Sequence, residues 1–194
     1  MKIGLISDTH GYFDPRIAEL LAGADVILHA GDVGTMNVLD ELALIAPVRA
    51  VKGNIDSDAL GLPLSLHFAL GGMHFEMQHI LPTPQSQIEK WSGSKQLSEA
   101  ETRSQRRFLA WFEPSTQVVI FGHSHQPCLA QLGEKLFVNP GSAGKKRFGL
   151  PRCCGEISIL NQEARVKILP LEDYNQDVPE SITFNLGGSA SCLH

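Results

Sequence analysis

Apolar runs and amphipathic stretches alternate along the first third of the chain. Three apolar runs of strand length and two stretches with helical spacing follow one another at residues 3–6, 15–21, 26–28, 36–46 and 48–51. Asp14 suits the N-cap and Pro15 the first position of the first helix, and Pro47 ends the second. Strands that alternate with helices favour parallel pairing, with the helices packed outside the sheet.

Hairpin patterns dominate the rest of the chain. Paired strands are predicted at residues 65–70 with 73–78, 128–131 with 135–138, and 156–160 with 165–169. A buried strand is expected at residues 118–121. A capping box begins a helix that continues over residues 102–112, whereas residues 82–98 are polar and show no strand pattern. The segment 182–186 is either part of a tail or an added edge strand.

Polar residues with metal-binding side chains follow several of these apolar runs. In parallel sheets, binding sites lie beyond the carboxyl ends of the strands, so these side chains are expected to converge. The candidate ligands are Asp8, His10, Asp32, Asn54, His79, His123 and His125.

This ligand set combines carboxylate, amide oxygen and imidazole and contains no thiolate. Such a set suits manganese, iron, cobalt, nickel or zinc, whereas calcium and magnesium would take mostly oxygen. Seven ligands are too many for one tetrahedral ion, so the sequence predicts two divalent transition-metal ions, with manganese as the first expectation. Asp32 is the natural bridge between them. Two ions about 3.5–4 Å apart would hold a bridging hydroxide and clamp phosphate oxygens.

Composition narrows the class of protein. The chain has 194 residues, 43% hydrophobic and 19% charged, with a formal net charge of −5. These values are ordinary for a globular protein and favour one domain without general nucleic-acid binding. No apolar run approaches the ~20 residues that span a bilayer, and the short apolar start does not suit a signal peptide. The four cysteines lack zinc spacing, so we expect reduced thiols and a cytoplasmic location.

The order and spacing of five motifs resemble those of the calcineurin-like metallophosphoesterase superfamily. The motifs are Asp8-x-His10, Gly31-Asp32, Gly53-Asn54, His79 and Gly122-His-x-His125. Together with Asn-Pro-Gly-Ser at 139–142, they look like the superfamily's small bacterial and archaeal phosphodiesterase branch. The resemblance covers about residues 1–170.

The resemblance implies an α/β (α+β) fold: a four-layer α/β/β/α sandwich of two mixed sheets flanked by helices. Residues 1–171 would form a single domain, with 80–116 as an inserted segment and helix that could cap the site. Residues 172–194 would be a C-terminal extension or tail.

The resemblance also divides the ligands between two ions. One ion would take Asp8, His10, Asp32 and His125, and the other would take Asp32, Asn54, His79 and His123. The residues expected to act in catalysis are Asp32, Asn54 and His123.

The chain departs from many relatives at two positions. Ile55 follows Asn54 where many relatives have a histidine that protonates the leaving oxygen, although the small branch commonly lacks it. General acid catalysis contributes roughly 10²–10⁴-fold, so its absence favours good leaving groups or a donor from elsewhere. Ile80 follows His79 where relatives usually have glycine.

Phosphodiester hydrolysis by a metal-bridging hydroxide is therefore the expected function, acting on a small phosphoester. The alternatives are a phosphomonoesterase of the same fold and a non-catalytic binding scaffold resembling a retromer subunit. A homo-oligomer remains open, and no membrane association is expected.

Three further features allow two interpretations each. His29 is either a satisfied core histidine or a group that orients Asp32 or another ligand. The run 145–147 is either a solvated charged turn or a contact for substrate phosphate. Ser142 lacks a visible activating base, which argues against a serine nucleophile.

Overall fold

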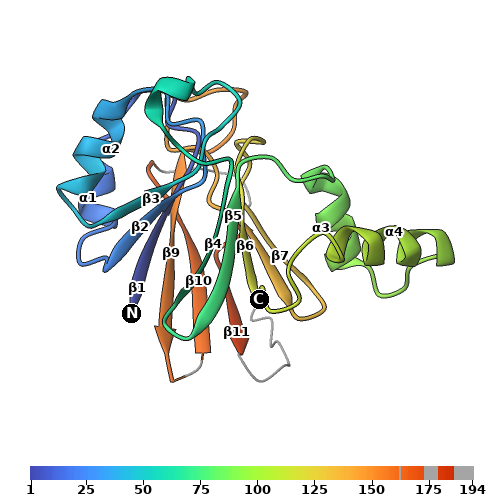
Figure 1. Ribbon diagram of the computed structural model, residues 1–194. Coiled ribbons are helices and arrows are strands. Elements are labelled where there is room, and N and C mark those ends of the chain that lie inside the picture. The colour runs from blue at the N-terminus through green and yellow to red at the C-terminus, as the bar shows by residue number, and fades with distance from the viewer. Residues whose placement is uncertain (162, 173–178, 186–194) are drawn as a thin grey trace.

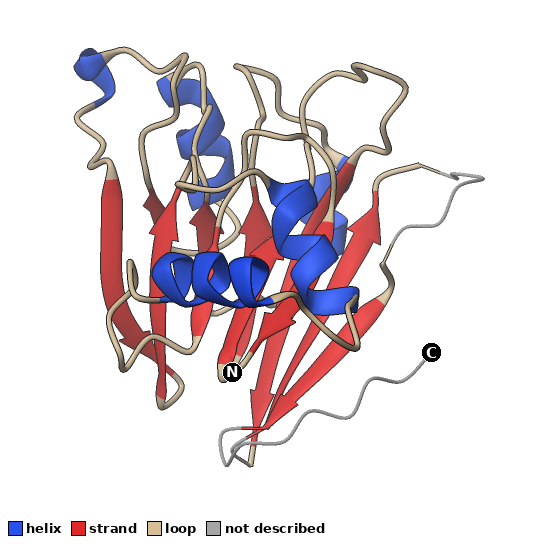
Figure 2. Ribbon diagram, turned by 90° about the vertical axis from the view of Figure 1, so that its right-hand side faces the viewer, coloured by secondary structure: helices blue, strands red, loops and turns tan. Residues whose placement is uncertain are grey.

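Two mixed β-sheets stack face to face, with helices on both outer sides (Figures 1 and 2). The computed structural model describes residues 1–161, 163–172 and 179–185. The four layers predicted from the sequence are confirmed. Within the described ranges no helix is long and apolar enough to cross a membrane.

The first sheet has six strands in the order β11-β10-β9-β1-β2-β3. Their bounds are β1 Lys2–Ile6, β2 Val26–His29, β3 Val48–Ala50, β9 Cys153–Leu160, β10 Glu163–Pro170 and β11 Ser181–Asn185. The first three strands are parallel, and Ile6 pairs with His29, which pairs with Ala50. Because these strands end level with one another, the loops that follow them meet at one edge.

The second sheet has five strands in the order β4-β5-β6-β8-β7. Their bounds are β4 Ser65–Leu70, β5 Met73–Gln78, β6 Val118–Ile120, β7 Cys128–Leu132 and β8 Lys135–Asn139. Strands β5, β6 and β8 are parallel, with Met77, Ile120 and Val138 in register. The segments after β5 and β6 therefore leave the same edge of this sheet.

Helices α1 (Arg16–Leu20) and α2 (Met36–Ala43) cover the outer face of the first sheet, at the left in Figure 1. Helices α3 (Gln85–Gly93) and α4 (Glu99–Leu109) cover the outer face of the second sheet, at the right. A short 3₁₀ helix spans Asp58–Leu60. Figure 2 views the molecule from the side of α3 and α4.

Apolar side chains fill the space between layers. Leu5 and Phe75 belong to the cluster between the two sheets, Leu42 belongs to the cluster beneath α1 and α2, and Phe137 packs under α4. Phe108 of α4 lies 5.2 Å from the Phe137 ring, centroid to centroid. The outer helices are therefore anchored to their sheets by buried rings and aliphatic chains, at roughly 1.5–3 kcal/mol for each fully buried side chain.

Several elements differ from the sequence-based prediction. Helix α3 lies in a segment for which no element was predicted, because Ile88 and Trp91 alone give it a buried stripe. Helix α1 begins after Pro15, so its N-cap is Pro15 and not Asp14, the residue that the sequence predicts. Asp14 instead accepts hydrogen bonds from the backbone N–H of Arg16 and from the guanidinium groups of Arg16 and Arg152.

The C-terminal strands also extend the prediction. Strand β9 begins at Cys153, three residues before the expected start. Its first three residues are all buried, and Cys154 packs into the cluster on the outer face of the sheet. Both faces of the strand are thus covered here, so these residues lack the alternation that marks a half-exposed strand. Strand β11 pairs antiparallel with β10, so residues 181–185 form an added edge. The last residue of the expected strand, Leu186, lies outside the described residues.

Candidate metal centre

Five of the seven candidate ligands have a left-handed backbone. Their φ angles lie between 50° and 71° at Asp8, His10, Asp32, His123 and His125. Among the described residues, only Phe148 and Asn161 otherwise combine positive φ with a side chain. This conformation costs a non-glycine residue about 1–2 kcal/mol, and strained backbone of this kind concentrates at functional sites.

Glycines let the ligand loops approach one another closely. A Cβ added to Gly53 would lie 2.0 Å from Asp32 Oδ1, and one added to Gly31 would lie 2.7 Å from His79 Nδ1. At Gly122 an added Cβ would lie 2.0 Å from Ser7 Oγ. Each glycine of the Gly-Asp, Gly-Asn and Gly-His motifs is thus needed where its loop packs against another ligand loop.

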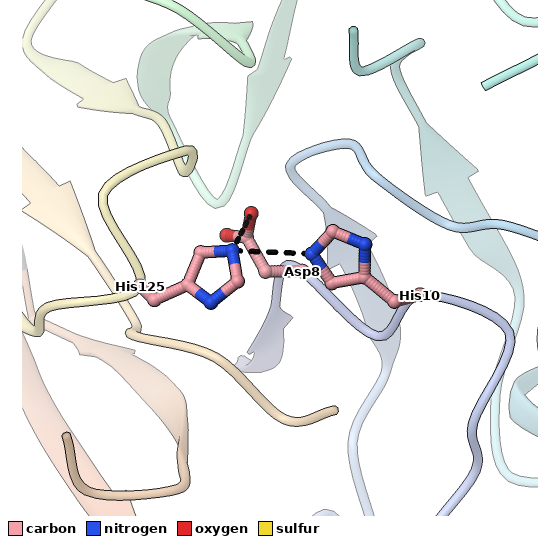
Figure 3. Close-up of side chains that lie close together, drawn as sticks. All are labelled: Asp8, His10 and His125. Atoms are coloured by element: carbon pink, nitrogen blue, oxygen red, sulfur yellow. Dashed lines mark hydrogen bonds and ion pairs between the residues drawn. The ribbon is translucent and has the colours of Figure 1, made fainter. Parts of the chain in front are cut away.

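Asp8, His10 and His125 form one group of facing donor atoms (Figure 3). Ser7 Oγ donates to Asp8 Oδ2 at 2.6 Å, and the backbone N–H of His123 donates to the same oxygen at 3.1 Å. Asp8 Oδ1 is buried without a hydrogen-bond partner among the described residues and lies 3.3 Å from His125 Nε2. One carboxylate oxygen is held by the protein, and the other is left for a cation.

The two imidazoles of this group point at each other. His10 Nε2 and His125 Nε2 are 3.1 Å apart, as the dashed line in Figure 3 marks. Burial and the positive charge of Arg147 lower the pKa of both rings, and His10 also lowers that of His125, which falls to about 4. Both rings are therefore neutral near pH 7 and offer lone pairs to a metal ion.

His79 belongs to a second group, with Asp8 and Asp32. Its Nδ1–H donates to the carbonyl of Ala30 at 2.7 Å, so the lone pair of the neutral ring is on Nε2. Nε2 faces Asp32 Oδ1 at 3.3 Å and Asp8 Oδ1 at 3.9 Å. Three acceptor atoms facing one another require a proton or a cation between them.

The pKa values of Asp8 and His79 reflect the close approach of these acceptor atoms without a cation between them. Burial raises the pKa of Asp8 to about 6, even though His79 opposes the shift. Burial would lower the pKa of His79, but the neighbouring Asp32 and Asp8 carboxylates outweigh it and raise that pKa. A proton is thus retained here more readily than on isolated side chains, in a place that a divalent cation could take instead.

Asp32 belongs to the second group and also faces His10 of the first group. Its Oδ1 is 3.3 Å from His79 Nε2, and its Oδ2 is 3.8 Å from His10 Nε2. Burial would raise its pKa, but His79 and the backbone N–H of Ile55 hold that pKa at about 2. Each oxygen of this carboxylate therefore faces a different histidine, the arrangement expected of a bridging ligand. Asp8 is common to both groups, whereas the sequence-based division gave it to one ion.

Asn54 and His123 complete the arrangement on its exposed side. His123 Nδ1 donates to Asn54 Oδ1 at 2.9 Å, and the His123 ring lies 5.4 Å from that of His79 between centroids. Both side chains are solvent-exposed, unlike Asp8 and His79. The structure thus brings all seven sequence-predicted residues together, with the opening on the side of Asn54 and His123.

The donor set fits divalent transition-metal ions. Asp8 Oδ1 and His79 Nε2 are buried polar atoms without hydrogen-bond partners in the described part of the chain. Buried polar atoms are rarely left unpaired, and each costs roughly 1–3 kcal/mol when they are. Metal ions at these atoms would remove that cost.

Comparison with known proteins identifies the family. Residues 1–162 match the calcineurin-like phosphoesterase superfamily domain. The chain belongs to this superfamily. The resemblance inferred from the five motifs is therefore confirmed.

Several members of the superfamily are similar over most of this chain. A probable metallophosphoesterase of Methanothermobacter thermautotrophicus is 30% identical over 157 residues, covering 78% of this chain and 82% of the relative. The phosphodiesterase YfcE of Escherichia coli K12 is 30% identical over 183 residues, covering 80% and 86%. The crystal structure of Chaetomium thermophilum Vps29 shares the fold, with a TM-score of 0.68 and 20% identity over 95% of this chain and 98% of that one.

Several residues that hold the ligand loops of this superfamily member were not predicted. Asp56 is buried and accepts three backbone N–H groups, from Val33 at 3.1 Å, Gly34 at 2.7 Å and Gly53 at 2.8 Å. It therefore fastens the Asp32 loop to the Asn54 loop. Its place two residues after Asn54, in a turn rich in backbone donors, was the only sequence signal.

The turn at 139–142 fastens two other ligand loops. Ser142 Oγ donates to the backbone carbonyl of Asp8 at 2.9 Å, which explains this buried serine without a nucleophilic role. Asn139 Nδ2 donates to the carbonyl of Gly122 at 3.0 Å. The loops after β1 and β6 are thus tied to one turn.

Within the described part of the chain, His29 hydrogen-bonds to no carboxylate and supports a loop instead. Its Nδ1 accepts from the backbone N–H of Gly31 at 3.2 Å, and its Nε2 donates to Thr9 Oγ1 at 2.9 Å. Burial lowers its pKa to about 3, so the ring is neutral. His29 is thus a hydrogen-bonded core histidine, and it acts on Asp32 through the backbone of the loop at Gly31.

Proposed function

We propose that the chain is a dinuclear metal-dependent phosphodiesterase. The observation that carries this proposal is the pair of donor groups that share Asp8, with Asp32 facing a histidine of each, within a chain of the calcineurin-like phosphoesterase superfamily. The named relative YfcE is a phosphodiesterase, which favours diesters over monoesters.

Each side chain has a proposed part. Two divalent ions, manganese first, would when bound supply an activated water and neutralise charge on the phosphoryl oxygens. Asp32 would bridge the two ion positions, while Asn54 and His123 would hold the exposed side, where the substrate enters. Arg147, whose charge lowers the pKa of His10 and His125, would contact a phosphate oxygen.

Protonation of the leaving group limits the substrates. Ile55 lies after Asn54 with half of its side chain exposed, and its backbone N–H is already donated to Asp32. This position therefore supplies no acid, and water would protonate the leaving oxygen. We accordingly infer a preference for esters of acidic alcohols or phenols, whose oxygen leaves with little help.

The likeness to Vps29 concerns the fold alone, so it is equally compatible with the alternative of a non-catalytic binding scaffold. Retention of all seven donor side chains in one cluster supports the enzyme instead.

The described cysteines, Cys128, Cys153 and Cys154, are free and buried, which supports the expected cytoplasmic location.

Hydrolysis of bis(4-nitrophenyl) phosphate tests the proposal. Metal-free protein should be inactive, addition of Mn²⁺ should restore turnover, and Asp32→Ala should reduce kcat/KM by about 10³-fold or more, since metal-assisted charge stabilisation is worth several kcal/mol. Asp40→Ala, an exposed change on α2, is the matched control and should leave activity unchanged. Metal-loaded protein that cleaves no phosphodiester or phosphomonoester would overturn the proposal.

A further inference from the structure

A cavity of about 300 Å³ lies against the exposed side of the metal centre. Residues 80–85, which directly follow His79, form one wall, and residues 121–124, which include His123, form the other. Two proposed ligands thus connect this cavity to the centre. Its volume is at the lower end for ligand sites, which suits one ring-sized group better than a whole substrate.

The walls of the cavity are mainly apolar and uncharged. Ile80, Leu81 and Phe121 supply aliphatic and aromatic surface, and the wall residues apart from His123 carry no ionisable side chain. Two of the polar groups are already engaged, because Ser124 Oγ donates to Gln85 Oε1 at 2.7 Å. Such a surface favours a neutral, flat group over a charged one.

The position of Gln85 shows that this wall is built into the fold. Its side-chain amide nitrogen, Nε2, donates to Glu89 Oε1 at 2.8 Å and to the carbonyl of Gln126 at 3.2 Å. Asn139 Nδ2 donates to Gln85 Oε1 at 3.1 Å. Helix α3 is therefore fastened to the loop that carries His123 and His125, which fixes the width of the cavity beside them.

We propose that this cavity binds the retained arm of a phosphodiester, as an uncharged ring. The inference rests on the proposed function and deepens it, because a phosphomonoester has no retained arm. The leaving oxygen develops negative charge and needs a donor or water. A mainly apolar cavity in which Ser124 and Gln85 are hydrogen-bonded to each other suits the arm that stays on phosphorus and undergoes no bond change.

Three substrates with the same leaving group test the proposal. Bis(4-nitrophenyl) phosphate retains an aryl arm, methyl 4-nitrophenyl phosphate retains a methyl group, and 4-nitrophenyl phosphate retains none. Thr83, half-buried in the cavity wall, is replaced by Trp to fill the cavity. The variant should lose about 10-fold or more in kcat/KM on the aryl diester and about 2-fold or less on the other two.

A second variant and a control complete the experiment. Ile80→Ala keeps the proposal testable even when Thr83→Trp does not fold, because Ile80 is at an exposed position. This variant enlarges the cavity and should lower kcat/KM for the aryl diester alone, by about 3-fold or more. The control is Ala110→Trp, in a cavity of about 400 Å³ between α4 and the β7–β8 turn, which shares no wall residue with the first. It should leave all three rates unchanged.

The outcomes are distinct. Equal losses on all three substrates, or no loss on any, would overturn the assignment of the cavity while leaving the phosphoesterase in place. Wild-type protein that hydrolyses none of the three with Mn²⁺ would instead overturn the proposed function itself.

Discussion

The ligand residues are held in a backbone conformation that most side chains avoid. Asp8, His10, Asp32, His123 and His125 all have positive φ. Each such residue costs about 1–2 kcal/mol, so the loops store strain in exchange for aiming five side chains at one point. Hydrogen bonds from neighbouring loops, such as those accepted by Asp56, offset that cost.

The strain predicts an unusual order of stability at His123, an exposed position with φ of 71°. Both His123→Ala and His123→Gly lose the hydrogen bond to Asn54, but only glycine relaxes the backbone. In metal-free protein His123→Gly should be about 1 kcal/mol more stable to urea than His123→Ala. At Gln126, exposed and without positive φ, alanine should be the more stable of the two. The same order at both positions would contradict the account.

Metal affinity should depend on pH because protons compete for the same atoms. The pKa of Asp8 is raised to about 6, and that of His79 is raised above its ordinary value of 6.5, so His79 takes up a proton first as the pH falls and Asp8 follows. The dissociation constant for Mn²⁺ should therefore already rise with falling pH above pH 6, where His79 takes up its proton, and rise more steeply below pH 6, where Asp8 does so too, by about 10-fold per pH unit for each proton displaced. Calorimetric titrations between pH 5 and 8 measure this, and a constant affinity would contradict it.

At the scale of elements, the parallel strands bring the ligand loops to one place. Strands β1, β2 and β3 end level in one sheet, and β5 and β6 end level in the other. The loops can then meet only where glycine removes a side chain. At Gly31 the missing Cβ leaves room for the ring of another ligand, His79.

Two alanine substitutions separate this packing effect from backbone strain. Gly31 and Gly23 both have positive φ, at 92° and 74°, but a Cβ on Gly23 would meet nothing within 4 Å. Both variants should lose about 1 kcal/mol of stability in urea denaturation. Gly31→Ala should in addition displace His79 and weaken Mn²⁺ binding by about 10-fold or more. Equal Mn²⁺ affinities would show that the contact with His79 does not matter.

Much of this architecture could be predicted from the sequence, for identifiable reasons. Buried strands give apolar runs that end at a ligand, and the Ser98 capping box marks the start of α4. Helix α3 was missed because only Ile88 and Trp91 reveal its buried face. The function of Asp56 was missed because its three partners are backbone N–H groups, which are the same in every sequence.

At the scale of the whole molecule, the candidate centre joins the two sheets. The loops of the first sheet supply Asp8, His10, Asp32 and Asn54, and the loops of the second supply His79, His123 and His125. Metal ions bound only by the folded chain would therefore stabilise the contact between the sheets by mass action. The same arrangement places the 300 Å³ cavity where the second sheet's loops meet the centre.

Titration of metal-free protein with Mn²⁺ tests the central claim most directly. Bound manganese and the rate of bis(4-nitrophenyl) phosphate hydrolysis are measured in the same samples. A dinuclear centre predicts that the rate reaches its plateau at about two equivalents of bound Mn²⁺ per chain, because both ions take part in the displacement. A plateau at one equivalent, or hydrolysis that is independent of bound metal, would contradict it.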